Sequence, residues 1–156
     1  MNYSDPFGLR VQIGCRPIGG ALGAMYSHCA IRIDDSYGHH YSFELMPVKV
    51  PGEPDTWNTI QSVPDEDEYT WTTVGAPEGM KDDEWDSTVR AAAEVVGYRM
   101  SGKKYHADGA RNSNHYVHEA ITTAGGNVPE SAKPKDGRKA PGLCGGSGAS
   151  TGECKP

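Results

Sequence analysis

The chain has no long hydrophobic run and is poor in apolar residues. No stretch approaches the roughly 20 apolar residues that cross a bilayer, and the N-terminus lacks the charged and then apolar layout of a signal peptide. Only 36% of the 156 residues are apolar, whereas 20 are glycine and 11 are proline. We therefore expect a single domain with a small core, long connections and no transmembrane segment.

Positive charge is also scarce, because 15 Lys and Arg stand against 21 Asp and Glu and the formal net charge is −6. Neutralisation of phosphates by Lys and Arg dominates the binding of nucleic acids. The charge therefore argues against a domain with a broad nucleic-acid-binding surface, although a local basic cleft stays compatible with it.

Closely spaced cysteines are missing as well. The four cysteines lie at positions 15, 29, 144 and 154 without a Cys-x-x-Cys pair, which argues against a structural zinc site. Cys144 and Cys154 either close a disulfide in the C-terminal tail or are free thiols, and their spacing does not choose between the two.

Residues 28–47 predict a β-hairpin with a histidine at the start of each strand. Apolar and polar residues alternate along 28–33, as is typical of a half-buried strand, and turn-forming residues follow at 34–38. Alternation along 40–45 places three polar side chains on one face: His40, Ser42 and Glu44. Because His28 opens the first strand, we expect it to meet His40 over one site.

Two further strands are expected, at 9–13 and 69–74, where β-branched and aromatic residues concentrate or alternate. The acidic stretch at 47–67 contains four prolines and predicts a long surface loop.

Two helices are expected. An apolar stripe at helical spacing, with acidic residues in its first turn, predicts a helix over 82–100. A second helix begins at Asn112 or Ser113, either of which can cap it, and stops at 124–126. After residue 129 the composition predicts an irregular tail.

The first residues carry a short motif, Asp5-Pro6-Phe7-Gly8-Leu9. It resembles the Asp-Pro-x-Gly-Leu boundary that ends the conserved shell of Rhs-repeat proteins, just before their variable C-terminal toxin. The resemblance implies a boundary motif at 1–9, a toxin domain at 10–130 and an irregular tail rich in Gly, Pro and Lys at 131–156. An ordinary Asp-Pro turn before a strand is the structural alternative.

This resemblance implies a secreted antibacterial effector, part of a polymorphic toxin, that is delivered into the cytoplasm or periplasm of a target cell, for example by type VI secretion. It also implies two partners, an immunity protein that neutralises the toxin and the Rhs shell of the full-length protein. The sequence itself chooses neither the secretion route nor the compartment.

The segment Asn112-Ser113-Asn114-His115-Tyr116-Val117 resembles the Asn-Cys-x-His-Phe-Val segment of the permuted papain-like superfamily, which includes lecithin–retinol acyltransferase-like enzymes. The spacing of His28 and His40 resembles the two-histidine hairpin of the same superfamily. The resemblance implies an α+β fold in which a small antiparallel sheet packs against two helices. It also implies a hydrolase or acyltransferase without a cofactor, acting on an amide or ester bond in a peptide, peptidoglycan or lipid.

In the implied site, Ser113 is the nucleophile, His28 takes its proton and His40 orients His28. Glu44 lies on the same strand face as His40 and can take over the orienting role if His40 points away. The free N–H groups and positive dipole end of the helix, flanked by Asn112 and Asn114, favour an oxyanion.

The nucleophile position departs from the superfamily, because Ser113 replaces its cysteine. A hydroxyl ionises far less readily than a thiol, so this change removes most activity from a site built for cysteine. Ser113 is therefore a natural serine nucleophile, an inactivating replacement or only a helix cap. In the last case the domain is catalytically inactive and acts by binding.

A toxin of another class, a nuclease or nucleotide-modifying enzyme, is the remaining alternative. His106 and Asp108 fit a nuclease-like loop, and His115 and His118 lie three residues apart in the second helix. Neither pair completes a metal-binding motif, so we expect no metal.

Overall fold

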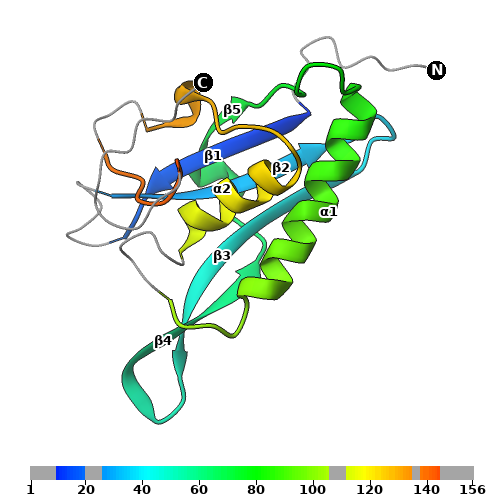
Figure 1. The fold of residues 1–156 in the computed structure, drawn as a ribbon. Coiled ribbons are helices and arrows are strands. Elements are labelled where there is room, and N and C mark those ends of the chain that lie inside the picture. The colour runs from blue at the N-terminus through cyan, green and yellow to red at the C-terminus, as the bar shows by residue number, and fades with distance from the viewer. Residues whose placement is uncertain (1–9, 20–25, 106–111, 135–137, 145–156) are drawn as a thin grey trace.

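The computed structural model describes residues 10–19, 26–105, 112–134 and 138–144. These residues form a five-stranded antiparallel sheet of order β4-β3-β2-β1-β5, and both helices lie on the same side of it (Figure 1). The predicted α+β class, with a small antiparallel sheet and two helices, is confirmed. The Asp-Pro-x-Gly-Leu motif lies outside the described residues.

The elements follow one another in a simple order. The strands are β1 (Val11–Pro17), β2 (Ser27–Asp34), β3 (His40–Val50), β4 (Glu53–Ser62) and β5 (Thr70–Thr73). The helices are α1 (Asp82–Met100) and α2 (Ser113–Thr123), with short 3-10 turns η2 (Glu66–Glu68) and η3 (Glu130–Ala132).

Strand alternation gives the sheet two unlike faces. One set of residues packs against the helices in the core and is at most 1% exposed: Val11, Ile13, Ile31, Ile33 and Leu45. Because successive side chains of a strand point to opposite faces, the residues between them lie on the other side of the sheet. We call this side, which carries Gly14, Arg16, His28, Arg32 and Glu44, the distal face.

The predicted hairpin is present, but the predicted loop at 47–67 is wrong. β3 pairs with β2 only along 40–43, continues to Val50, and pairs along 44–50 with β4. Pro47, opposite Thr59, sits in this extension. The prolines suggested a loop, but a long hairpin whose two arms mainly contact each other tolerates them.

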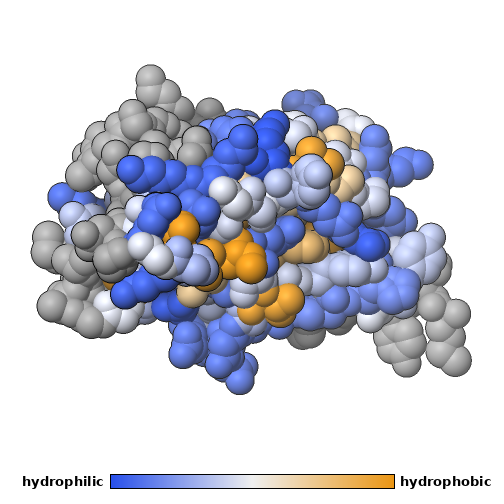
Figure 2. All heavy atoms as spheres, turned by 90° about the horizontal axis from the view of Figure 1, so that it is seen from below, coloured by the Kyte–Doolittle hydropathy of each residue, from blue (hydrophilic) through white to orange (hydrophobic). Residues whose placement is uncertain are grey.

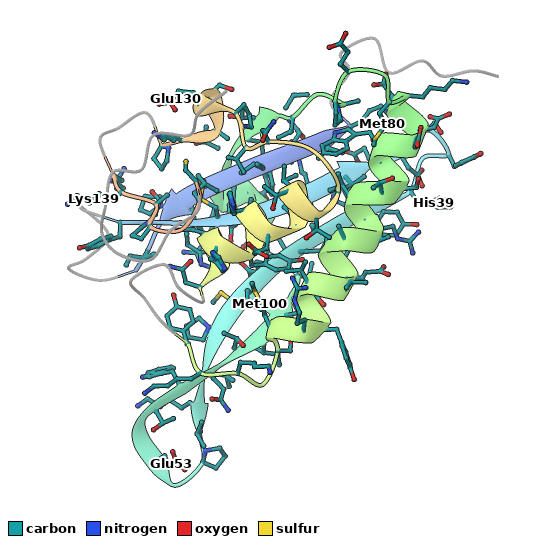
Figure 3. All side chains as sticks on the ribbon, viewed as in Figure 1. His39, Glu53, Met80, Met100, Glu130 and Lys139 are labelled. Atoms are coloured by element: carbon teal, nitrogen blue, oxygen red, sulfur yellow. A yellow bond between two sulfur atoms is a disulfide. The ribbon has the colours of Figure 1, made fainter. Side chains whose placement is uncertain are left out.

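This second hairpin projects beyond the body of the molecule, with Glu53 at its tip (Figures 1 and 3). Large apolar side chains remain between 40% and 75% exposed on β3, on β4 and just after β4: Val48, Trp57, Ile60 and Val63. Seen from below, apolar residues gather near the middle of the surface with hydrophilic ones around them (Figure 2). Much of the projecting arm is therefore outside the core.

Both helices form where their sequence signals predict. α1 spans the predicted residues 82–100 and carries three acidic residues in its first turn. Asn112 caps α2, since its side-chain oxygen accepts a hydrogen bond from the backbone N–H of His115 at 2.9 Å. None of the described helices has the length and apolar content needed to cross a membrane.

A disulfide that the sequence did not reveal joins β1 to β2. Cys15 and Cys29 are opposite each other in the strand register, with their Cα atoms 4.1 Å apart, and their sulfurs are bonded. Only the register brings these residues together, because they are 14 positions apart in the chain. Cys144 is also disulfide-bonded, so it is not a free thiol, and Cys154 lies outside the described residues.

Part of the predicted irregular tail packs on the body. The backbone N–H of Ser27 donates to the carbonyl of Lys139 at 2.8 Å, and Leu143 is 0% exposed within the core. Residues 138–144 therefore contribute to the same folded unit as the sheet.

Candidate active site

A buried acid–base pair occupies the distal face. His28 on β2 and Glu44 on β3 are joined by a 2.8 Å contact between Nε2 and Oε2. Their exposed fractions are only 6% and 5%. The hydroxyl of Tyr69 donates to the same Glu44 oxygen at 2.5 Å, and Ser62 Oγ donates to the other oxygen at 3.4 Å. Glu44 is thus the centre of a small hydrogen-bonded cluster.

The surroundings keep Glu44 ionised. Burial by itself raises the pKa of this carboxyl, but hydrogen bonds from His28 and Tyr69 and the charge of Arg16 outweigh burial and lower its pKa below the usual value. The pKa of Tyr69 is raised, first by burial and then by its bond to Glu44. Tyr69 therefore acts as a hydrogen-bond donor to a carboxylate.

The Glu44 contact defines the chemistry available to His28. A carboxylate accepts hydrogen bonds, so the contact with Glu44 assigns the proton to Nε2 when the imidazole is neutral. Nδ1 then carries the lone pair, and it makes no hydrogen bond within the part of the chain that the structure describes. In this tautomer the Nδ1 atom of His28 can accept a proton.

The structure does not bring His40 to His28. In an antiparallel hairpin the start of one strand lies beside the end of the other, and His40 is opposite Asp34, six residues along β2 from His28. Both ring nitrogens of His40 contact carboxylates, Nδ1 that of Asp34 at 2.6 Å and Nε2 that of Glu66 at 2.7 Å. Glu44, the alternative orienting residue, is the one that contacts His28.

The first turn of α2 is docked on the backbone on both sides of His28. Asn114 accepts a hydrogen bond from the N–H of Cys29 at 2.9 Å and donates to the carbonyl of Ser27 at 3.0 Å. Ser113 Oγ donates to the carbonyl of Cys29 and accepts from the N–H of Leu45 at 3.5 Å. The helix that carries the predicted nucleophile is therefore fixed to the strand that carries the predicted base.

These contacts replace part of the β ladder. Regular pairing of β2 with β3 stops at Ile31 and Phe43, so backbone groups beyond this point need other partners. Ser113 bridges the carbonyl of Cys29 on β2 and the N–H of Leu45 on β3. Ser113 as a whole residue is 1% exposed. Its hydroxyl makes no hydrogen bond to His28 in the described structure.

Sequence reasoning missed two members of this cluster, Tyr69 and Arg16. Arg16 is opposite His28 in the β1–β2 register, and its Cζ lies 5.5 Å from the centroid of the Tyr69 ring. The alternation of Tyr69 with Trp71 was a signal that both rings face the same side of a strand. Which side it was depended on the sheet register.

No group of three His, Cys, Asp or Glu is arranged to hold a metal among the described residues. His118 Nδ1 contacts the carbonyl of Leu143 at 3.2 Å, and its ring stacks with that of His115 at a centroid distance of 6.3 Å. His106 and Asp108 lie outside the described residues, so the nuclease-like loop stays a prediction.

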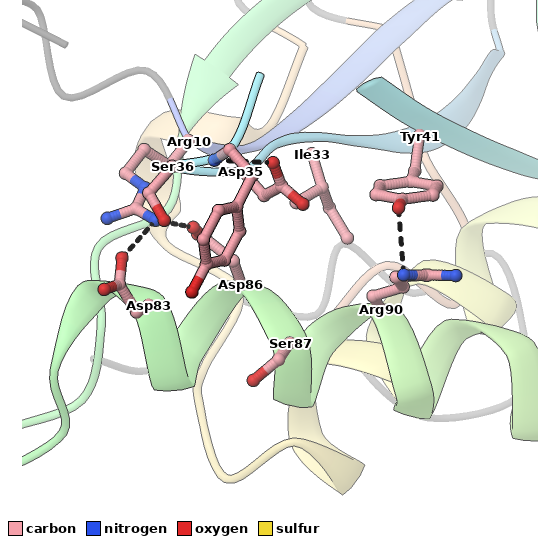
Figure 4. Close-up of a pocket in the computed structure, with 10 residues that line it drawn as sticks. Arg10, Ile33, Asp35, Ser36, Tyr41, Asp83, Asp86, Ser87 and Arg90 are labelled. Carbon is pink, nitrogen blue, oxygen red and sulfur yellow. Dashed lines mark hydrogen bonds and ion pairs between the residues drawn. The ribbon is translucent and has the colours of Figure 1, made fainter. Parts of the chain in front are cut away.

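A separate pocket lies between the β2–β3 turn and α1 (Figure 4). There Arg10 pairs with Asp83 at 2.7 Å and with the 2%-exposed Asp86. Burial raises the pKa of Asp86 to about 6, although the charge of Arg10 opposes the shift. Arg90 donates to the hydroxyl of Tyr41 at 2.9 Å and lies over its ring. These pairs attach the start of β1 and the hairpin to α1.

Searches for similar proteins find no matching protein family, no matching curated protein and no matching solved structure.

Proposed function

We propose that this domain is the C-terminal toxin of an Rhs-type effector and has a permuted papain-like arrangement. In this proposal it cleaves or transfers an acyl group at an amide or ester bond. The observation that carries it is the buried 2.8 Å contact between His28 and Glu44, beside a helix N-terminus docked on either side of His28. Burial of an ionisable base and acid costs free energy by desolvation, and such pairs are concentrated at functional sites.

The proposed roles follow from the contacts. Glu44 replaces His40 as the residue that orients His28, and Tyr69 holds Glu44 in position. Ser113 Oγ attacks the substrate carbonyl carbon while Nδ1 of His28 takes the hydroxyl proton. His28 returns this proton to the leaving amine or alcohol, and water or an acceptor then releases the acyl group. The N–H groups that open α2 stabilise the oxyanion.

This mechanism requires one movement. α2 covers the side of the sheet opposite to the distal face that carries the His28 side chain. The Ser113 hydroxyl must therefore leave the carbonyl of Cys29 and reach His28 between β2 and β3, beyond the end of their pairing at Ile31 and Phe43. The attached N–H of Leu45 then loses its acceptor, which costs about 1–3 kcal/mol unless the substrate or water replaces the bond.

A catalytically inactive binding domain is the second candidate. It is favoured by the two backbone hydrogen bonds of Ser113, because a serine that bridges two strands has a structural purpose without any chemistry. The proposed biological setting is the same for both candidates: delivery into a target cell and neutralisation by an immunity protein.

Substitution of the base tests the proposal. We expect His28→Ala to lower toxicity and acyl-ester or peptide hydrolysis by about 100-fold or more, the usual contribution of a general base. The matched control is His39→Ala, a histidine whose side chain is 63% exposed in the hairpin turn. Circular dichroism checks that both variants fold. Full toxicity of His28→Ala would remove the proposal.

Substitution of the nucleophile separates the two candidates. Restoring the superfamily residue with Ser113→Cys raises hydrolysis if the site is a cysteine site, whereas Ser113→Ala abolishes it if the serine is the nucleophile. An unchanged toxicity in both variants, together with wild-type folding, supports the binding domain. Cleavage of RNA, DNA or nucleotides by the purified domain, tested with and without chelator, would support the nuclease class instead.

A further inference from the structure

One short segment crosses the whole distal face. Residues 63–69, which include η2, connect β4 to β5, and these strands are the opposite edges of the sheet. The connection must therefore pass over β3, β2 and β1. Contacts of Glu66 with His40 and of Tyr69 with Glu44 put it on the distal face. We call residues 63–69 the strap.

The strap encloses the candidate site. Its last residue, Tyr69, bonds to Glu44, and the Tyr69 ring centroid is 6.2 Å from that of His28. With the strap in this position, His28 is 6% exposed and Glu44 is 5% exposed. In the proposed mechanism His28 returns a proton to the leaving group of the substrate, and so small an exposed fraction does not let a substrate reach the His28 ring.

The strap is attached mainly by charge. Of its four consecutive acidic residues, Asp65, Asp67 and Glu68 are exposed and Glu66 is half-buried. Glu66 and Glu68 each lie near a cation of the distal face. Glu66 contacts His40 at 2.7 Å, and Glu68 lies 3.4 Å from Arg16. Partly exposed ion pairs of this kind stabilise the attachment only weakly.

Apolar anchoring is limited to the two ends of the strap. Pro64 and Tyr69 are buried, whereas Val63 is 75% exposed. In the middle, the carbonyl of Glu66 accepts a hydrogen bond from the indole N–H of Trp71 at 3.0 Å. The centre of the strap thus depends on Glu66 for its attachment to the sheet.

We propose that the strap is a lid over the His28–Glu44 site, and that the His40–Glu66 ion pair is the latch that holds it closed. The claim that the covered residues form an active site rests on the proposed function. The claim that the strap opens does not depend on it. The position of His40 excludes the predicted role of orienting His28. In the proposed lid, His40 instead holds the strap through its contact with Glu66.

The charges around His40 determine how the strength of the latch changes with pH. His40 faces Asp34 from β2 and Glu66 from the strap, with Arg32 diagonally placed on β2 and Glu44 further along its own strand. The bond to Asp34 and then that to Glu66 raise the pKa of His40, against the lowering effect of burial. As long as Glu66 is ionised, the latch is therefore complete below pH about 6.5, the usual histidine value, and it weakens as the pH rises through the raised pKa of His40.

Amide hydrogen exchange of the strap tests the latch without any assay of activity. The probes are the N–H groups of Glu68 and Tyr69, which bond within η2 to the carbonyls of Asp65 and Glu66 at 3.2 Å. We expect Glu66→Gln and His40→Gln to accelerate their exchange by about two- to fivefold at pH 6, the range for a partly exposed ion pair. The matched control is Asp67→Asn, an exposed acid of the same strap.

Carbethoxylation of His28 by diethyl pyrocarbonate, followed by mass spectrometry, measures whether the lid covers the site. We expect faster modification of His28 in Glu66→Gln than in Asp67→Asn, and faster modification of the wild type at pH 8 than at pH 6 after correction for the reagent's own pH dependence. Equal rates in both variants would overturn the lid. Faster exchange and faster His28 modification in Glu66→Gln, combined with full toxicity of His28→Ala, would instead leave the lid standing and refute the proposed hydrolase.

Discussion

At the scale of single residues, Ser113 combines a structural contact with the proposed chemistry. Its hydroxyl fills the place of a missing ladder hydrogen bond between β2 and β3, and it does so from the first turn of α2. The same position is the one that the papain-like resemblance assigns to the nucleophile. A serine in such a place is held firmly, so its freedom to turn toward His28 decides between enzyme and binding domain.

The structural part of this role predicts a loss of stability. Ser113→Ala leaves the carbonyl of Cys29 and the N–H of Leu45 buried without this partner, which lowers the free energy of unfolding by about 1–3 kcal/mol. Urea denaturation measures the change. The control is Ser87→Ala, a serine of α1 whose hydroxyl bonds only within its own helix, to the carbonyl of Glu84. Equal midpoints for the two variants would contradict the bridging role.

At the scale of elements, the distal face of the sheet is shaped by a glycine. Trp71 of β5 is opposite Gly14 of β1, and its ring lies flat over the position where a side chain of Gly14 would stand. The guanidinium of Arg32 on β2 lies over the Trp71 ring, with its Cζ 4.4 Å from the ring centroid. The indole N–H of Trp71 in turn donates to the carbonyl of Glu66 in the strap. The missing side chain of Gly14 thus leaves room for the ring that contacts the strap.

Filling this position predicts local repacking. In Gly14→Ala the new Cβ would lie 2.5 Å from the Trp71 ring, so the ring must move, at a cost of about 1–3 kcal/mol. Near-ultraviolet circular dichroism and thermal unfolding measure the shift of the ring and the loss of stability. Gly75→Ala is the control, because nothing lies within 4 Å of its Cβ position. Identical effects at the two glycines would argue against the close packing of Trp71.

At the scale of the whole molecule, charge links the beginning of the described chain to the helical layer. Arg10 precedes β1 and pairs with Asp83 and Asp86 of α1, while Asp86 is 2% exposed. A buried carboxylate costs free energy when ionised, even beside an arginine, since desolvation disfavours the charged form. The stability of the whole fold therefore depends on the protonation of Asp86.

The sign of this dependence follows from the raised pKa. The folded protein holds the Asp86 proton up to a pKa of about 6, above the ordinary value of 3.8, so this group favours folding at low pH and loses that contribution as the pH rises toward 6. We expect the free energy of unfolding of the wild type, minus that of Asp86→Asn, to fall by about 2.4 kcal/mol between pH 4 and pH 8. Urea titrations across this range measure it, and parallel pH profiles would contradict the buried ionisation.

Much of the local structure was predictable because its signals are local. The acidic first turn and apolar stripe of α1, the Asn112 cap of α2 and the turn between β2 and β3 each depend on a few neighbouring residues. The arm at 47–62 was missed since its prolines resemble those of a loop, and only pairing between its two strands makes it a hairpin.

The candidate site was half predictable for the same reason. Alternation placed Glu44 on one strand face, and the helix signature located Ser113, so both residues could be named from the sequence. Whether His28 and His40 lie together depends on the register of β2 and β3, which the sequence does not reveal. The register puts His40 beside Asp34, and Glu44 contacts His28 instead.

The sequence by itself determined which segments become strands or helices and which polar side chains are available, because these properties depend on side-chain periodicity and capping over a few residues. The tertiary structure alone decided their partners. It joined Cys15 to Cys29, closed the strap over His28 and set Ser113 between two strands. Each of these contacts spans a long distance in sequence and depends on the order and register of the strands, which local patterns do not fix.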